Sequence, residues 1–147
     1  MIKIVPRFTK ADITKMMDAK RKQIEKAIIS RFKFIGEKFI SMARIEGNYK
    51  DRTGNLRASI GYVVLKDGQQ LKKSFPGSTK EGKREARKVI SESIKEFPRG
   101  FVLIVVAGME YAAAVESKGY DVLTASSKVI EVDLKKSISE LSKKLDR

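Results

Sequence analysis

The sequence predicts an α+β fold for a single domain that spans residues 1–147. Apolar residues recur at helical spacing from about Lys10 to Ile45, through KEGKREARKVISESIKEF, and again from about Thr124 onward. Strand patterns lie between these stretches, in SIGYVVLKDGQQLKK with its hairpin signal Asp67-Gly68, and in the apolar, β-branched run FVLIVVAG. A chain of 147 residues is long enough for one compact domain with its own core.

The N-terminal helix is predicted from apolar residues spaced by three, four or seven. They are Ile13, Met17, Ile24, Ile28, Phe32, Ile35, Phe39 and Met42. Thr9, followed by Asp12, supplies an N-cap and an acidic first turn. A helix of about 36 residues would be about 54 Å long, which exceeds the width of a domain of this size. We therefore expect this helix to bend or break near Gly36, or to project toward a partner.

The middle of the chain predicts a hairpin, a helix and a buried strand. The returning arm of the hairpin, QQLKKSF, has only a weak strand pattern. Residues 101–108 are apolar on both faces, so they are expected to form the central strand. A basic loop and helix, about 69–98, has the character of an insertion. The segment EYAAAVESKGYDV is ambiguous between a short helix and a strand.

The net charge of +14 lies entirely in the first two thirds of the chain, because residues 101–147 carry 7 Lys and Arg against 7 Asp and Glu. Such a field attracts polyanions: nucleic acid, an acidic membrane surface or an acidic protein face. The alternative is a solvated surface kept soluble by charge repulsion. Candidate polyanion contacts are Lys72, Lys73, Lys83, Arg84, Arg87 and Lys88.

The absence of both cysteine and histidine excludes several kinds of chemistry. It removes thiol nucleophiles, disulfides, thiolate or imidazole zinc sites and Ser-His-Asp triads. The N-terminus lacks a signal-peptide pattern, and the longest apolar run, FVLIVVAGM, is about half of what a membrane-spanning helix needs. We expect a soluble, unexported protein with no cofactor and no membrane partner.

A metal-dependent nuclease would need an Asp and a Glu-x-Lys triplet on a nearby strand. Two triplets occur, Glu81-Gly-Lys83 and Glu116-Ser-Lys118, but such triplets arise by chance in a chain that is 34% charged. Phosphate-binding glycine loops and aromatic RNA-binding strands are both missing. Any nucleic-acid binding is therefore expected to be non-specific and sensitive to salt.

The stretch DRTGNLRASI, residues 51–60, joins the long helix to the first strand. Thr53-Gly54-Asn55 is typical of a turn, in which Gly54 or Asn55 takes a positive φ and Thr53 or Asn55 caps a short helix. A helix-to-strand connector explains every residue except Arg52 and Arg57. These two arginines flank the turn and face solvent, a carboxylate or a partner.

Two segments in this order resemble one known family. The first is Arg52-Thr53-Gly54-Asn55-Leu56-Arg57, with Ser59-Ile60 entering a strand after a long helix. The second is Tyr111-Ala112 with Val115-Glu116, then Gly119 and Asp121-Val122-Leu123-Thr124 before the last helix. From about residue 10 to 146, the chain is similar to the small tail-completion proteins of tailed bacteriophages, also called head-tail joining, neck or minor tail proteins. It departs from them at Lys118-Gly119-Tyr120, where many relatives carry Gly-Thr and a proline-rich segment.

The resemblance implies a non-enzymatic α+β protein with a long N-terminal helix and further helices packed on a small, mostly antiparallel sheet. It implies a homo-oligomeric ring between the portal or adaptor and the tail tube, located in the virion at the head-tail junction and in the bacterial host cytoplasm before assembly. The expected interface or hinge residues are Arg52, Thr53, Gly54, Asn55, Leu56, Arg57, Tyr111 and Glu116. A basic, non-specific nucleic-acid-binding protein is the alternative, and a metal-dependent nuclease ranks below it.

Overall fold

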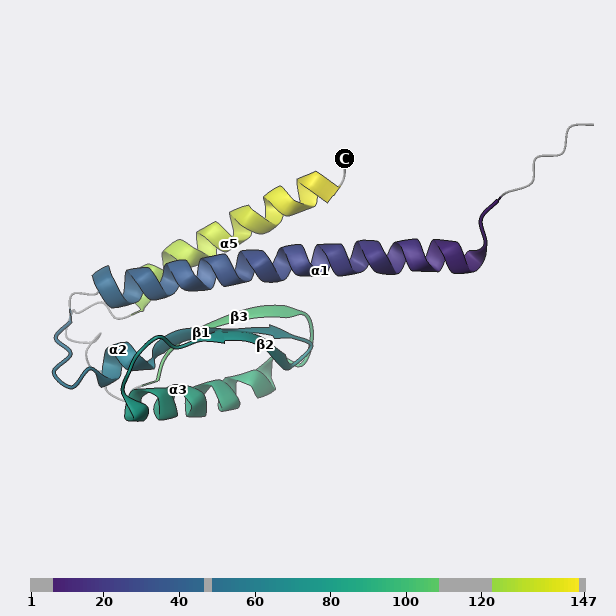
Figure 1. The fold of residues 1–147 in the computed structure, drawn as a ribbon. Helices are drawn as coiled ribbons and strands as arrows, with labels where there is room; N and C mark the ends of the chain where they lie inside the picture. Colours follow the sequence, from purple (N-terminus) through teal and green to yellow (C-terminus); the bar gives the residue numbers. More distant parts are fainter. Residues whose placement is uncertain (1–6, 47–48, 109–122, 146–147) are drawn as a thin grey trace, which may run out of the picture.

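The computed structural model describes residues 7–46, 49–108 and 123–145. Its elements are α1 (Lys10–Ser41), a π-helical turn (Met42–Glu46), α2 (Asn55–Ser59), β1 (Ile60–Lys66), β2 (Gln69–Ser74), α3 (Lys80–Ser93), a 3-10 turn (Ile94–Glu96), β3 (Phe101–Ala107) and α5 (Thr124–Leu145). The strands form an antiparallel sheet of order β2-β1-β3. Helices α1 and α5 cover one face of the sheet and α3 covers the other (Figure 1). The predicted α+β class is confirmed.

The central strand is β1, so the prediction that residues 101–108 form the centre of the sheet is wrong. Those residues form β3, which pairs only with β1 among the described strands. Every residue of β1 from Ile60 to Leu65 is buried, because both faces of this strand are covered. Tyr62 and Val64 belong to the core under α1, whereas Val63 and Leu65 belong to the core under α3. The apolar run of β3 neither made it the central strand nor buried it fully, since only Ile104 and Val106 are buried.

The hairpin predicted at Asp67-Gly68 is present, with both residues at positive φ. Its returning arm is the fully formed strand β2, although nearly all of its residues are exposed. Pairing with β1 accounts for this strand, and the register shifts between Val64 and Leu65. The segment 69–98 thus supplies an edge strand and the helix that covers one sheet face.

Helix α1 continues through Gly36 without the expected bend or break. Its start is fixed by a reciprocal capping box, in which Asp12 N–H donates to Thr9 Oγ1 at 3.2 Å and Thr9 N–H donates to Asp12 Oδ2 at 2.7 Å. Gly36 instead permits close packing, because an added Cβ would lie 2.5 Å from the ring of Tyr62. The glycine therefore brings the sheet against the helix.

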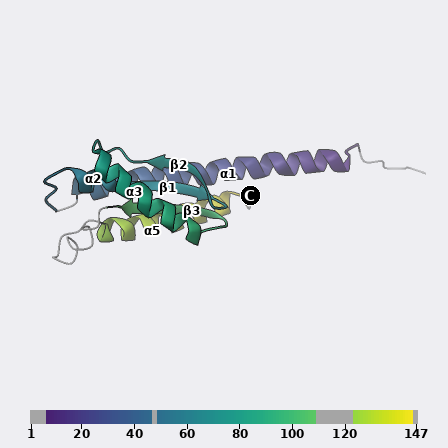
Figure 2. The same ribbon diagram turned by 90° about the horizontal axis from the view of Figure 1, so that it is seen from below.

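The other expectation for this helix, that it projects from the domain, is confirmed for its N-terminal half. Residues 10–23 are exposed along their whole length, and this half of α1 extends past the sheet and past α5 (Figure 2). The packed half contributes Phe32, Ile35, Phe39 and Ile40 to the core, where α5 adds Ile130. Among the residues that the structure describes, no helix is long and apolar enough to cross a membrane.

Candidate functional site

The connector after α1 is built around the one-turn helix α2, as its turn residues predict, but the predicted cap by Thr53 or Asn55 is wrong, because Gly54 is the N-cap and no side chain caps the helix. Gly54 takes the positive φ of 75° and precedes the helix, while its carbonyl accepts a hydrogen bond from the Ala58 N–H at 3.0 Å. The backbone N–H of Arg57 donates to Asp51 Oδ2 at 2.8 Å. Leu56, fully buried, anchors the turn in the core. The hydrogen bonds of Gly54 and Asp51 hold the backbone of the turn, and the burial of Leu56 holds it against the core.

The connector is also held against the start of α3. Asn55 Nδ2 donates to Glu81 Oε2 at 2.6 Å. Gly77 and Gly82 approach Ala58 so closely that a Cβ on either glycine would overlap it. The carboxylate of Glu81, one of the two considered for a metal, thus binds an amide of the connector. No group of three acidic side chains suited to a metal ion occurs within the described parts of the chain.

The two arginines of the connector differ in their surroundings. The guanidinium of Arg57 lies 5.4 Å from the centre of the Tyr49 ring, which is a cation–π contact. Tyr49 is buried, its hydroxyl donates to the carbonyl of Ala43 at 3.0 Å, and burial raises the pKa of its phenol. Arg52 and Thr53 are exposed. Tyr111 and Glu116, the second predicted pair, lie outside the described residues.

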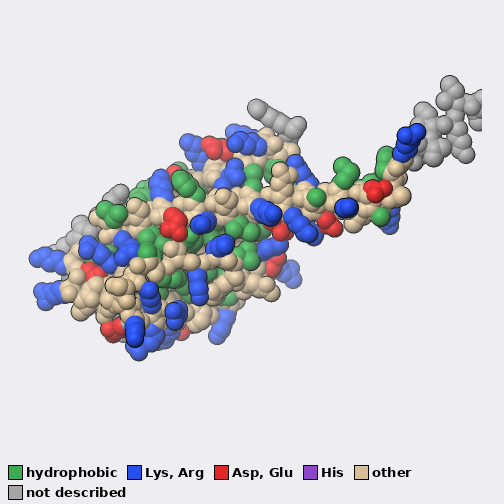
Figure 3. All heavy atoms as spheres, viewed as in Figure 1, with side chains coloured by type: hydrophobic (Ala, Val, Ile, Leu, Met, Phe, Trp, Pro, Cys, Tyr) green, Lys and Arg blue, Asp and Glu red, His purple; other side chains and the backbone are tan. Residues whose placement is uncertain are grey.

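The projecting half of α1 is an exposed surface with an apolar stripe. The exposed fraction is 44% for Ile13, 73% for Met16 and 67% for Met17. Basic residues accompany them, and of the two acidic ones Asp12 is held in the capping box and Asp18 pairs with Arg21 at 3.4 Å. Figure 3 shows this mixture of apolar and basic side chains on the extension. Sequence periodicity placed Ile13 and Met17 on the apolar face of the predicted helix, whereas the structure leaves both exposed.

The stripe continues to the root of the projection. Met17, Ile24 and Ile28 line a shallow hollow of about 410 Å³ beside Phe101 of β3, and the charged residues Lys20, Arg21 and Glu25 complete its lining. The core under α1 begins at this point, since Ile28 and Phe101 both pack against it. The exposed apolar side chains are therefore a continuation of the core beyond the edge of the sheet.

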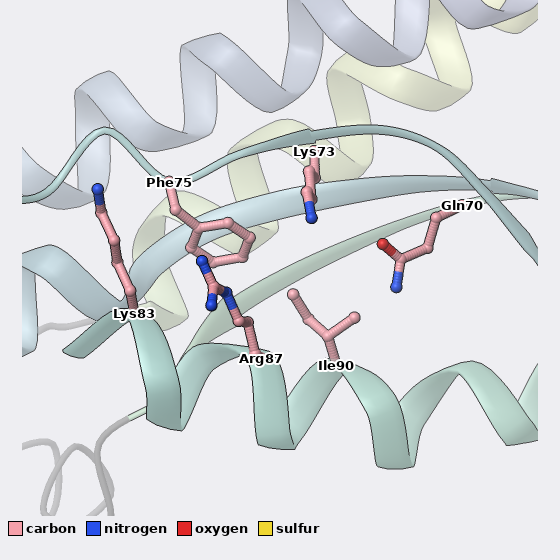
Figure 4. A pocket seen from close by; sticks show the side chains of 6 residues that line it. All are labelled: Gln70, Lys73, Phe75, Lys83, Arg87 and Ile90. Atoms are coloured by element: carbon pink, nitrogen blue, oxygen red, sulfur yellow. The ribbon is translucent and has the colours of Figure 1, made fainter. Parts of the chain in front are cut away.

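A basic pocket lies on the other side of the sheet, between β2 and α3. It has a volume of about 420 Å³ and is lined by Gln70, Lys73, Phe75, Lys83, Arg87 and Ile90. Figure 4 shows the side chains of both elements directed into the space between them. Two apolar side chains and three cations thus share one cavity, and no carboxylate lines it.

The six predicted polyanion contacts divide between surfaces. Lys73, Lys83 and Arg87 line the pocket. Lys72 pairs with Val64 of β1 and so belongs to the sheet face under α1, because paired residues point to the same face. Arg84 Nε contacts Glu85 Oε1 at 3.2 Å, and Lys88 is exposed on α3 without lining the pocket. Strand alternation could have separated Lys73 from Lys72 in the sequence. The four-residue spacing of Lys83 and Arg87 could have placed these two residues on one face of the helix.

No protein-family model, curated protein or solved structure matches this chain. The function must therefore be inferred from the three surfaces just described: the connector, the projecting half of α1, and the pocket between β2 and α3.

Proposed function

We propose that this chain is a non-enzymatic structural component of a tailed phage or prophage, and that it forms part of the ring that joins head and tail. The order of the Arg52–Arg57 connector and the Tyr111–Glu116 segment supports this proposal through the resemblance described above. The observation that carries it is the exposed, partly apolar half of α1.

The physical reason lies in the cost of a helix that packs against nothing. An isolated helix of about 14 residues is marginal in water, since most helical stability in proteins comes from packing of an apolar face. Residues 10–23 receive no such packing from the described part of their own chain. A neighbour that covers Ile13 and Met17 would supply it.

The charge of the molecule agrees with the same role. A net charge of +14 suits an acidic neighbouring ring, and it also suits DNA that passes through the joint. One observation favours the alternative function of nucleic-acid binding, namely the cluster of cations in the pocket between β2 and α3.

The test is electron microscopy of lysates from the encoding phage or prophage with this gene deleted in frame, beside a complemented control. Separate heads and tails, or tails of abnormal length, are the expected result for a joining protein. Normal infectious particles from the deletion strain would overturn the proposal.

A further inference from the structure

The cations of the pocket between β2 and α3 have no partner within the part of the chain that the structure describes. Lys73 comes from the edge strand, whereas Lys83 and Arg87 come from successive turns of α3 (Figure 4). None of their side chains makes an ion pair or a hydrogen bond to another described residue. Acidic residues of α3 are present, but none lines this space. The pocket therefore concentrates positive charge that its own walls do not neutralise.

The apolar wall of the pocket is fixed by the backbone. Phe75 lies across Gly61 of β1 so closely that a Cβ at that position would overlap its ring. The ring also packs against the buried core under α3, which includes Val63, Ala86 and Ile90. A pre-positioned aromatic ring next to cationic groups is the arrangement with which proteins bind nucleotides of single strands, by stacking the base and pairing the phosphate.

We infer that this pocket binds a nucleotide unit, with its phosphate between Lys73, Lys83 and Arg87 and its base against Phe75. The number of cations favours nucleotide phosphate over the lone carboxylate of an acidic side chain, because the phosphate monoester of a free mononucleotide carries a charge of about −1.5 to −2, and a strand presents a negative charge at every successive phosphate. Arg87 adds a planar fork that matches two phosphate oxygens. The volume of about 420 Å³ falls within the range of small-ligand pockets.

A free mononucleotide and a unit of a single-stranded nucleic acid both offer a base and a phosphate, although the phosphate within a strand is a diester with a single negative charge. Duplex DNA differs, because its bases are stacked on each other and do not present a face to Phe75. This inference goes beyond the joining role and does not depend on it, since it concerns a property of the purified protein.

The experiment measures fluorescence anisotropy of a labelled oligothymidylate of about eight nucleotides. Lys73→Glu is compared with Lys72→Glu, which makes the same charge change on the next residue of β2 but on the opposite face. We expect Lys73→Glu to weaken binding about tenfold or more, and Lys72→Glu about twofold, because only the first places a carboxylate in the pocket. Phe75→Leu should also weaken binding, with thermal unfolding recorded to show that the variant is folded.

Competition identifies the source of the nucleotide. Displacement of the labelled strand by thymidine monophosphate would support a free nucleotide as ligand, and displacement only by unlabelled single strand would support a nucleic-acid strand. Three results would overturn the inference: no binding of the oligonucleotide, equal weakening by Lys73→Glu and Lys72→Glu, or equally tight binding of a duplex or of polyglutamate. Failure of this test leaves the particle phenotype of the deletion strain untouched, so the two proposals fail separately.

Discussion

Leu56 and Arg57 are neighbours in α2, yet their side chains lie in opposite environments. Leu56 is fully buried in the core under α1, whereas Arg57 is exposed and lies over the ring of Tyr49. The connector thus contains one residue that belongs to the fold and one that is available to a partner. Substitutions at these two positions should separate folding from assembly.

Leu56→Asp should lower the free energy of unfolding by about 4 kcal/mol or more, because it buries an unpaired carboxylate. Arg57→Glu should lower it by about 1 kcal/mol or less through loss of the cation–π contact, and should damage particle assembly. Chemical denaturation of the purified variants measures both values. An equal loss of stability in the two variants would contradict this division.

Gly36→Ala tests the close packing between α1 and the sheet. Alanine favours a helix by about 1 kcal/mol over glycine, but its Cβ would lie 2.5 Å from the Tyr62 ring. Overpacking of this kind costs about 1–3 kcal/mol, so we expect a net loss of stability in thermal unfolding. Lys33→Ala, on the exposed side of the same helix, is the control and should change stability by less than about 0.5 kcal/mol. A stabilised Gly36→Ala variant would show that Tyr62 does not approach the helix as described.

The phenol of Tyr62 should make stability decline in alkali. Burial raises its pKa, and its hydrogen bond to Glu37 Oε1 at 2.9 Å raises it further. The unfolded chain releases this proton near pH 10 while the folded chain retains it, so the contribution is complete below about pH 10 and falls as the pH rises above it. Denaturation of wild type and Tyr62→Phe across this range measures the effect. Identical pH dependence in both proteins would exclude it.

At the scale of elements, α1 consists of two halves with different surroundings. Its C-terminal half packs on the sheet and on α5, and its N-terminal half continues the apolar stripe into solvent. The side that carries Met17 and Ile24 lines one hollow, whereas Ala11 and Ala19 line another with mainly polar and basic neighbours. Two surfaces of one helix can therefore be altered independently.

Ile13→Glu with Met17→Glu should leave the purified protein as stable as the wild type, within about 0.5 kcal/mol, because both side chains are exposed. In complementation, the same variant should fail to restore particles, since a partner would have to bury two carboxylates. Ala11→Glu with Ala19→Glu makes the same charge change on the other side of the helix and should complement. If both variants complemented equally well, the apolar stripe of α1 would not be part of an interface.

The periodicity of apolar residues was sufficient to place the helices, because a buried helical face requires the same spacing wherever it packs. It was not sufficient to order the strands, since β1 and β3 are both apolar and only their pairing distinguishes centre from edge. A bend or break near Gly36 was one of the two expectations for α1, because local propensity contains no information about Tyr62, which lies far along the chain. The strand β2 has a weak sequence pattern because it is exposed and is held in place by its pairing with β1, which local propensity does not show.

The candidate sites show a similar limit. The connector was predictable, because turn residues act locally and Gly54 adopts the positive φ that its sequence suggests. The pocket was not, because it joins Lys73 to Lys83 and Arg87 across the gap between a strand and a helix. Charge composition named these residues together with Lys72, Arg84 and Lys88. The register of β2 separates Lys72 from Lys73, and Arg84 and Lys88 lie on α3 outside the pocket lining.

At the scale of the whole molecule, a sheet with helices on both faces carries a long helix that extends beyond the domain on one side (Figures 1 and 2). The basic pocket lies on the opposite sheet face from this helix. In the roles that we propose, the exposed half of α1 would meet a protein neighbour and the basic pocket would bind an anion. We regard the covering of α1 by a neighbour as the central claim about function.

Cryo-electron microscopy of tailed particles from the encoding phage or prophage tests this claim most directly. We predict density for a ring of this protein at the head-tail joint, with Ile13 and Met17 of each subunit buried against a neighbouring chain. Purified infectious particles that lack the protein, or a joint in which residues 10–23 stand free in solvent, would contradict it.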